Sequence, residues 1–81
     1  MKFKIGDKVR VVSLMNTENA FNLDENGFMR AALYNIYEVE YIDNRPDNNR
    51  IYLSFRDKYN YRYMWHENDL QLVSSKELEI E

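Results

Sequence analysis

Residues 36–56, IYEVEYIDNRPDNNRIYLSFR, contain the pattern that decides the predicted fold. Residues 36–42 alternate between apolar and polar side chains, as expected of a strand with one buried face. Residues 43–49, rich in Asn and Asp around one proline, form the strongest turn signal in the chain, and residues 50–56 then alternate again. Ile42 falls out of phase with the residues before it, which predicts a β-bulge or a sharp bend there. Tyr37, Val39 and Tyr41 share one side of the first strand, and Ile51, Leu53 and Phe55 point inward from the second.

Three further segments carry the same alternation. Residues 8–13 place Val9 and Val11 on one face, residues 61–66 alternate as well, and residues 70–73 form a last short strand. Five short strands joined by turns, with one short helix after the first strand, predict a mainly β protein, a small, partly open five-stranded barrel. A ferredoxin-like fold would require a second helix, for which the sequence has no pattern. The predicted core includes Val9, Val11, Val39, Ile51, Leu53, Phe55 and Leu70.

The predicted helix covers about residues 24–34. Asp24 is suited to the N-cap position, and Asn35 can supply the left-handed residue that ends a helix. A helix this short is not stable alone, so we expect its apolar stripe to pack on the sheet and cover one open end of the barrel. The polar residues 16–22 before it have no clear period and are predicted to form a long loop. The stripe consists of Phe28, Met29, Ala32 and Leu33.

Three motifs spread over residues 3–73 carry a family resemblance. The pattern F-x-x-G-D-x-V-x-V over residues 3–11 resembles the opening of SH3-like and KOW-like small barrels, where a Gly-Asp turn leads into the first strand. Residues 29–42 are similar to the short helix, turn and strand of many small uncharacterised bacteriophage and prophage proteins, and W-x-x-x-D-L-x-L over residues 65–72 resembles their last strand. The resemblance implies an SH3-like fold and a phage or prophage origin. It implies no particular activity, because this fold hosts many unrelated functions.

Length and composition limit the classes of function. Eighty-one residues make one domain, predicted as a barrel over residues 1–73 and a charged tail, residues 74–81, that we expect to be frayed. The absence of cysteine excludes disulfides, thiolate metal sites and cysteine nucleophiles. No apolar stretch approaches the roughly 20 residues of a membrane span, and Met1 to Lys4 lead directly into a strand pattern, so we expect a cytoplasmic protein without membrane contact. The net charge of −3 gives no long-range attraction to a phosphate backbone and disfavours nucleic acid.

Residue types suited to catalysis are sparse. His66 is the one histidine, and its cluster with Glu67 and Asp69 is interpreted as a solvated turn rather than a metal site. Glu38 and Glu40 share a strand face as paired carboxylates might, but side chains two apart on a strand usually face solvent together. There is no glycine-flanked serine and no phosphate-binding glycine loop. We therefore predict that the protein is not an enzyme and uses no cofactor and no metal.

An aromatic group is the main candidate for a binding site. Tyr61, Tyr63 and Trp65 alternate on one face of a strand. In a thin barrel only one strand face can be core, and two interpretations stay open: the three rings pack inward, or some point outward and join Tyr52 and Arg56 in an exposed patch. Tyrosine, tryptophan and arginine are the residues that anchor protein interfaces. The candidate binding residues are Tyr52, Arg56, Tyr61, Arg62, Tyr63 and Trp65.

Two functions follow from this group. The first is a protein-interaction module, a phage product that docks on a host or defence protein through its aromatic face. The alternative is a nucleic-acid-binding barrel, in which the rings stack on bases beside a local basic patch. The acidic net charge and the many tyrosines favour the protein partner. The basic residues of the alternative are Arg45, Arg50, Arg56, Lys58 and Arg62.

Overall fold

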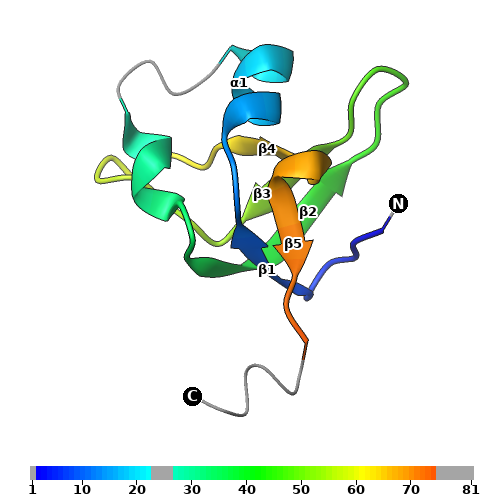
Figure 1. The fold of residues 1–81 in the computed structure, drawn as a ribbon, viewed down its shortest axis with the longest axis horizontal. Coiled ribbons are helices and arrows are strands. Elements are labelled where there is room, and N and C mark those ends of the chain that lie inside the picture. The colour runs from blue at the N-terminus through cyan, green and yellow to red at the C-terminus, as the bar shows by residue number, and fades with distance from the viewer. Residues whose placement is uncertain (1, 23–26, 75–81) are drawn as a thin grey trace.

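The chain forms one five-stranded antiparallel sheet in the computed structural model, which describes residues 2–22 and 27–74. The strands are β1 (Lys8–Val11), β2 (Ile36–Asp43), β3 (Arg50–Leu53), β4 (Met64–His66) and β5 (Leu70–Leu72), with an α-helix, α1 (Met15–Phe21), and two 3₁₀ helices, η1 (Phe28–Ala32) and η2 (Glu67–Asp69). The sheet order is β4-β3-β2-β1-β5 (Figure 1), and the two end strands are not paired with each other. The predicted fold class, a mainly β, partly open five-stranded barrel with a short helix after the first strand, is confirmed.

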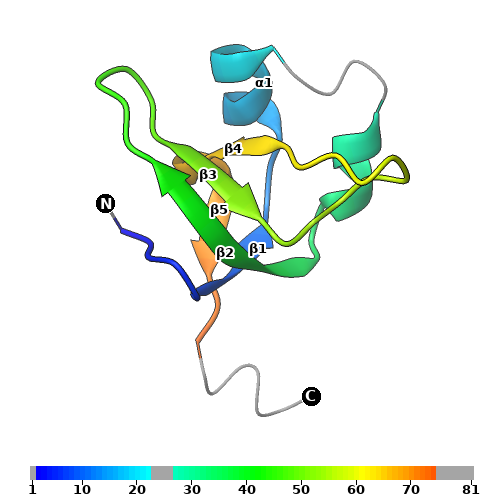
Figure 2. The same ribbon diagram turned by 180° about the vertical axis from the view of Figure 1, so that it is seen from behind.

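Strand β2 pairs with β1 along its first half and with β3 along its second half, and the pairing with β3 contains a bulge (Figure 2). Val39 lies opposite Leu53, but Tyr41 lies opposite Tyr52, the residue next to Leu53. Glu40 is therefore the extra residue that has no partner of its own in β3.

The bulge reverses the alternation of β2. Val39 before it is fully buried, whereas Tyr41 after it is 50% exposed. Ile42 packs against the core instead. The predicted bulge exists, but it lies at Glu40 rather than Ile42. The prediction that Tyr41 shares the side of Val39 is wrong, because the extra residue turns Tyr41 outward.

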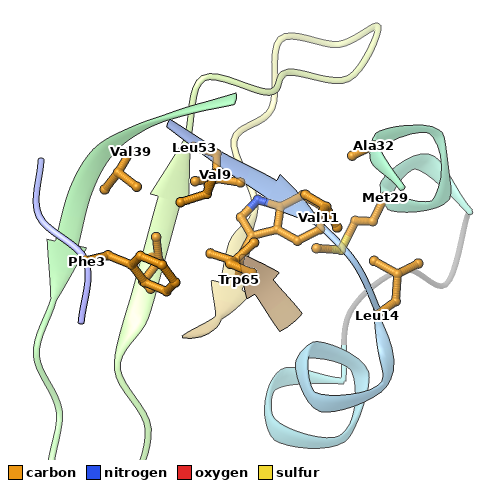
Figure 3. Close-up of a cluster of buried hydrophobic side chains, with 11 residues drawn as sticks. Phe3, Val9, Val11, Leu14, Met29, Ala32, Val39, Leu53 and Trp65 are labelled. Carbon is orange, nitrogen blue, oxygen red and sulfur yellow. The ribbon is translucent and has the colours of Figure 1, made fainter. Parts of the chain in front are cut away.

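The core is one cluster of buried apolar side chains that line the inside of the curved sheet. Trp65 from β4 lies in the middle of this cluster and is fully buried (Figure 3). Every residue of the predicted core belongs to the cluster except Phe55, which is half-buried and packs against it. The cluster consists of Phe3, Val9, Val11, Leu14, Met29, Ala32, Val39, Ile51, Leu53, Trp65 and Leu70.

The helical segments differ from the prediction in position and type. The predicted long loop at residues 16–22 is wrong, because α1 occupies Met15–Phe21. The predicted helix over residues 24–34 is represented by the 3₁₀ helix η1, and residues 24–26 lie outside the described residues. From its predicted stripe, Met29 and Ala32 are fully buried in the core and Leu33 packs against it, as expected, whereas Phe28 is half-buried and contacts the Tyr59 ring. The predicted tail, residues 74–81, lies outside the described residues except for Ser74.

The left-handed residue after η1 is Tyr34, with φ of 68°, and not Asn35 as predicted. Left-handed backbone is costly for a bulky side chain. Here the Tyr34 amide donates a 2.6 Å hydrogen bond to the carbonyl of Val11 and the Val11 amide donates to the carbonyl of Asn35. The register between this turn and β1 therefore outweighs the local preference for asparagine.

Helix α1 is held by a carboxylate from the other end of the chain. Asp69, fully buried in η2, accepts the backbone N–H groups of Asn16 at 3.2 Å and of Thr17 at 2.7 Å, and the Asn16 side-chain amide at 2.8 Å. The Ser13 hydroxyl accepts the Met15 amide at 3.0 Å. The amides at the start of α1, which have no partner inside a helix, are thus satisfied.

The same contact closes one edge of the sheet. The Thr17 hydroxyl, buried beneath α1, accepts the backbone N–H of His66 at 3.0 Å. His66 belongs to the end strand β4, so α1 takes the place of a further strand beside it. Asp69, Thr17 and His66 therefore join α1, η2 and β4 into one unit.

The pKa of Asp69 reflects this environment. Burial alone would raise the pKa of the Asp69 carboxyl, but hydrogen bonds from the side chains and backbone amides of Asn16 and Thr17 outweigh burial and hold the pKa below its ordinary value. A carboxyl with a lowered folded pKa stabilises the fold above its unfolded pKa, which is about 3.9 for aspartate. That contribution is lost as the pH falls through the folded pKa.

We expect Asp69→Asn to lower the free energy of unfolding by about 1–3 kcal/mol at neutral pH, because α1 loses a charged acceptor for buried donors. The measurement is urea unfolding followed by Trp65 fluorescence at a series of pH values. The difference in free energy of unfolding between variant and parent should narrow as the pH falls below about 4, where the parent loses the contribution of the ionised Asp69 carboxylate. Glu67→Gln, in the same turn, is the control and should change little. A difference that stays constant with pH would contradict this account of Asp69.

We expect Leu53→Ala to lower the free energy of unfolding by about 2–5 kcal/mol, because it leaves a cavity in a fully buried site. Leu72→Ala removes the same atoms from a side chain that is 54% exposed, and should cost about 1 kcal/mol or less. Urea unfolding of both variants gives the comparison. Equal losses would mean that the core does not lie on the inner face of β3.

Candidate functional site

The structure divides the six predicted binding residues between two places. Trp65 has 0% exposure and Tyr63 packs against the core, so these two rings belong to the inner face of the sheet. Tyr61, on the same face, is 54% exposed. Tyr52, Arg56 and Arg62 belong to a different group, which also contains two residues that were not predicted, Glu40 and Tyr41.

We call this second group the Tyr–Arg patch, defined as Glu40, Tyr41, Tyr52, Arg56 and Arg62. Tyr41 and Tyr52 lie opposite each other on β2 and β3, and their ring centroids are 5.8 Å apart. The Arg62 guanidinium lies over the Tyr52 ring, 5.0 Å from its centroid. Such a cation–π contact is worth about 0.5–1 kcal/mol at an exposed site. Two rings and a guanidinium are thus held in one arrangement on the outer surface of the sheet.

Glu40 connects the two arginines of the patch. Its Oε1 atom accepts a hydrogen bond from Arg56 Nη2 at 2.7 Å and a longer one from Arg62 Nη1 at 3.4 Å. The hydrogen bond from Arg56 lowers the pKa of Glu40, and together with the Arg56 charge and the contacts of Arg62 it outweighs the opposing effect of burial. Glu40 is therefore ionised at neutral pH and acts as a charge partner.

Arg56 has a structural task of its own. Its Nη1 atom donates to the backbone carbonyls of Leu53 at 2.9 Å and Phe55 at 3.1 Å, while Nη2 reaches Glu40. The guanidinium therefore ties the end of β3 to the bulge in β2. Arg62 has no such anchoring to the backbone in the described residues, and its side chain is more exposed than that of Arg56.

The inner-face aromatic residues form a chain of ring contacts that leads from the core to the surface. The ring centroid of Phe55 lies 6.0 Å from that of Trp65 and 6.3 Å from that of Tyr63, and the centroids of Tyr63 and Tyr61 are 4.7 Å apart. The Tyr63 hydroxyl donates to Asp57 at 2.8 Å. Asp57 also accepts the backbone amides of Tyr59 and Tyr61 and so orders the loop between β3 and β4. Of the two interpretations of the aromatic group, packing therefore describes Trp65 and Tyr63.

The basic residues of the nucleic-acid alternative are largely paired with acids. Arg45 lies 2.9 Å from Asp43, and Arg50 lies 4.0 Å from Asp47. Lys58 lies over two aromatic rings, those of Phe28 and Tyr59. These side chains do not add up to a continuous positive surface.

The turn of His66, Glu67 and Asp69 also has structural contacts. His66 Nδ1 accepts the backbone amide of Asn68 at 3.0 Å, and Nε2 lies 2.9 Å from the Asn48 side-chain oxygen. Asp69 is occupied by α1, as described above. Within residues 2–22 and 27–74, no three His, Asp or Glu side chains are grouped so that they could hold a metal ion.

A groove on another side of the molecule is a competing binding surface. Its volume is about 340 Å³, and it lies between the start of α1 and the end of η1. The exposed apolar side chains of Met15 and Tyr34 line it, and the ion pair between Glu18 and Arg30, at 3.2 Å, lies at its rim. The groove therefore offers a ligand both exposed apolar side chains and an ion pair.

Glu40 and Tyr41 were not predicted as binding residues, and they lie together in the patch because of the bulge. In a regular strand adjacent residues face opposite sides, so one of the two would be turned away from the patch. The loss of phase at Ile42 was the available signal. It did not reveal which residue was the extra one, since that depends on the pairing with β3.

No protein-family model, curated protein or solved structure matches the chain. In the part of the chain that the structure describes, no helix has the length and apolar character needed to span a membrane.

We expect the buried and the exposed members of the six predicted binding residues to contribute differently to the free energy of unfolding. Trp65→Ala should lower the free energy of unfolding by about 3–5 kcal/mol, because it empties the centre of the core. Arg62→Gln should change it by no more than about 0.5 kcal/mol, because the side chain is exposed and its contacts are weak. Thermal unfolding followed by circular dichroism checks both. A strongly destabilised Arg62→Gln variant would show that Arg62 serves the fold.

Proposed function

We propose that the domain is a non-catalytic binding module that contacts a protein partner through the Tyr–Arg patch. The observation that carries the proposal is the ordered pair of tyrosine rings with a guanidinium over one of them, on an exposed face of the sheet. Tyrosine buries a large area on binding at little cost in conformational entropy, and both tyrosine and arginine are enriched among the residues that dominate the energetics of protein interfaces. Glu40 holds the Arg56 guanidinium at 2.7 Å and makes only the longer contact, 3.4 Å, with Arg62.

The pairing of charges favours a protein over a nucleic acid. Binding to a phosphate backbone draws its affinity from unpaired basic side chains that release counterions. Arg45, Arg50 and Arg56 each face a carboxylate, and the net charge of the chain is −3. Nucleic-acid binding therefore has less support than protein binding.

The resemblance to phage and prophage proteins suggests where the partner occurs. On that basis we propose a cytoplasmic protein that docks on a host or defence protein. The bulk of the partner's contact would lie over β2 and β3, where the patch is exposed.

We expect the double variant Tyr41→Ser with Tyr52→Ser to lose partner capture by at least about tenfold, because each anchor ring contributes about 2 kcal/mol of binding. The immobilised domain is incubated with a nuclease-treated lysate of its source cells, and captured proteins are quantified by mass spectrometry. The matched control is Tyr59→Ser with Tyr61→Ser, which removes two exposed tyrosines outside the patch. This control should capture the same partner as the parent.

Binding through the groove between α1 and η1 would contradict the proposed site. Met15→Ser changes a groove residue and leaves the Tyr–Arg patch intact. If Met15→Ser loses the partner while the double variant Tyr41→Ser with Tyr52→Ser retains it, the proposed site is wrong and the groove is the interface. All variants are first compared with the parent by circular dichroism, so that loss of binding is separated from loss of fold.

A further inference from the structure

We infer that the protein partner presents an acidic segment, one carboxylate of which pairs with the Arg62 guanidinium beside Tyr52. This inference rests on the proposed function of the Tyr–Arg patch and specifies the chemistry of its partner. It follows from the balance of charges around the patch, from the geometry of Arg62 and from the small number of charges involved.

The charges on this side of the sheet do not cancel. Asp43 lies 2.9 Å from Arg45 and Asp47 lies 4.0 Å from Arg50, whereas Arg56 and Arg62 share the single carboxylate of Glu40. Four arginines thus face three carboxylates, which leaves one surplus positive charge. The arginines are Arg45, Arg50, Arg56 and Arg62, and the acids are Glu40, Asp43 and Asp47.

The charge that is open to a partner lies on Arg62, because the Arg50 guanidinium lies over the Phe21 ring and its Nη1 atom is buried. Arg56 makes the shorter hydrogen bond to Glu40, 2.7 Å against 3.4 Å, and also binds two backbone carbonyls. In the described residues Arg62 has only the longer contact with Glu40 and its position over the Tyr52 ring. Its guanidinium has five N–H donors in a planar fork, so several remain for a partner.

A carboxylate fits this arrangement. Guanidinium and carboxylate groups pair through two parallel hydrogen bonds, and a guanidinium that is already held over a ring loses little freedom when it pairs. The exposed Tyr41 ring, next to Tyr52, offers an apolar surface for a neighbouring side chain of the same segment. One acidic and one apolar side chain, close together on the partner, would therefore occupy the patch.

One surplus charge suits a carboxylate better than a polyanion. A nucleic acid strand carries a phosphate at each nucleotide and needs a series of unpaired basic residues. Beyond Arg62, the arginines Arg45, Arg50 and Arg56 already face Asp43, Asp47 and Glu40, so they offer such a strand little further attraction. An acidic protein segment can place a single carboxylate at Arg62 and avoid these acids.

The test uses two blocked peptides as probes of the purified domain. One consists of glutamates around a single phenylalanine, and in the other lysines replace the glutamates. Binding is followed by NMR signals of the arginine Nε–H groups and the tyrosine rings. We expect the glutamate peptide to shift Arg62, Tyr41 and Tyr52 in a saturable manner, with a Kd of about 1 mM or below, and the lysine peptide to cause no such shifts.

Three variants make the test specific. Arg62→Gln should raise the Kd of the glutamate peptide about tenfold or more, because it removes the pairing group. Arg45→Gln, the matched control, removes an arginine that has its own aspartate and should change the Kd by no more than about twofold. Glu40→Gln should lower the Kd by about threefold or more, because it removes the carboxylate that competes for Arg62. A purely structural role of Glu40 would not improve binding.

Several results would overturn the inference. These are no saturable shift at millimolar glutamate peptide, equal or stronger shifts with the lysine peptide, or an unchanged Kd in Arg62→Gln. Stronger shifts of the patch with single-stranded oligothymidine than with the glutamate peptide would also overturn it in favour of phosphate. If captured partners still depend on Tyr41 and Tyr52 but not on Arg62, the proposed function stands and only the acidic partner is wrong. If capture does not depend on the two tyrosines, the proposed function itself fails.

Discussion

The contact between the Asp69 carboxylate and the first turn of α1 is the interaction on which the rest of the fold depends. Asp69 accepts hydrogen bonds from Thr17 and Asn16, which lie 52 and 53 positions before it in the sequence, and the Asp69 side chain is fully buried. Through Thr17 it also places α1 against the edge of β4, which would otherwise be open. A buried carboxylate is stable only when hydrogen bonds replace its lost hydration, and the helix amides supply them. One set of hydrogen bonds therefore joins the helix, the last turn and the sheet edge.

This dependence explains which parts of the fold could be predicted. Strands β1 and β3 could be predicted from their own residues, because the side chains of each alternate between the core and solvent within a few residues. Helix α1 has no such signal, since Thr17 is its one buried residue and all of α1 is described. Its stability comes from an acceptor far along the chain, which local periodicity cannot contain. The turn at Tyr34 is similar, because its left-handed backbone is fixed by hydrogen bonds with β1.

The candidate site could be predicted only where side chains alternate regularly between the two faces of a strand. Opposite faces for Arg62 and Trp65 follow from their spacing, and the structure places one at the surface and the other in the core. Which face was the core could not be known from one strand, because Tyr and Trp suit both environments. The pairing of Tyr52 with Tyr41 was missed because it depends on the register of β2 against β3. That register contains the bulge, which no residue type in the sequence marks.

The bulge links the fold to the proposed function. The pairing of β2 with β3 contains one extra residue, and such a bulge bends and twists the strand. The same extra residue brings Glu40 and Tyr41 to the surface together. Without it, Glu40 and Tyr41 would face opposite sides of the sheet, and the patch would lose either its acid or its second ring. Since Glu40 can neutralise only one of the two arginines, the bend also determines that Arg62 keeps a charge to offer. A bulge in the backbone thus contributes to a surface with one ordered, partly uncompensated guanidinium.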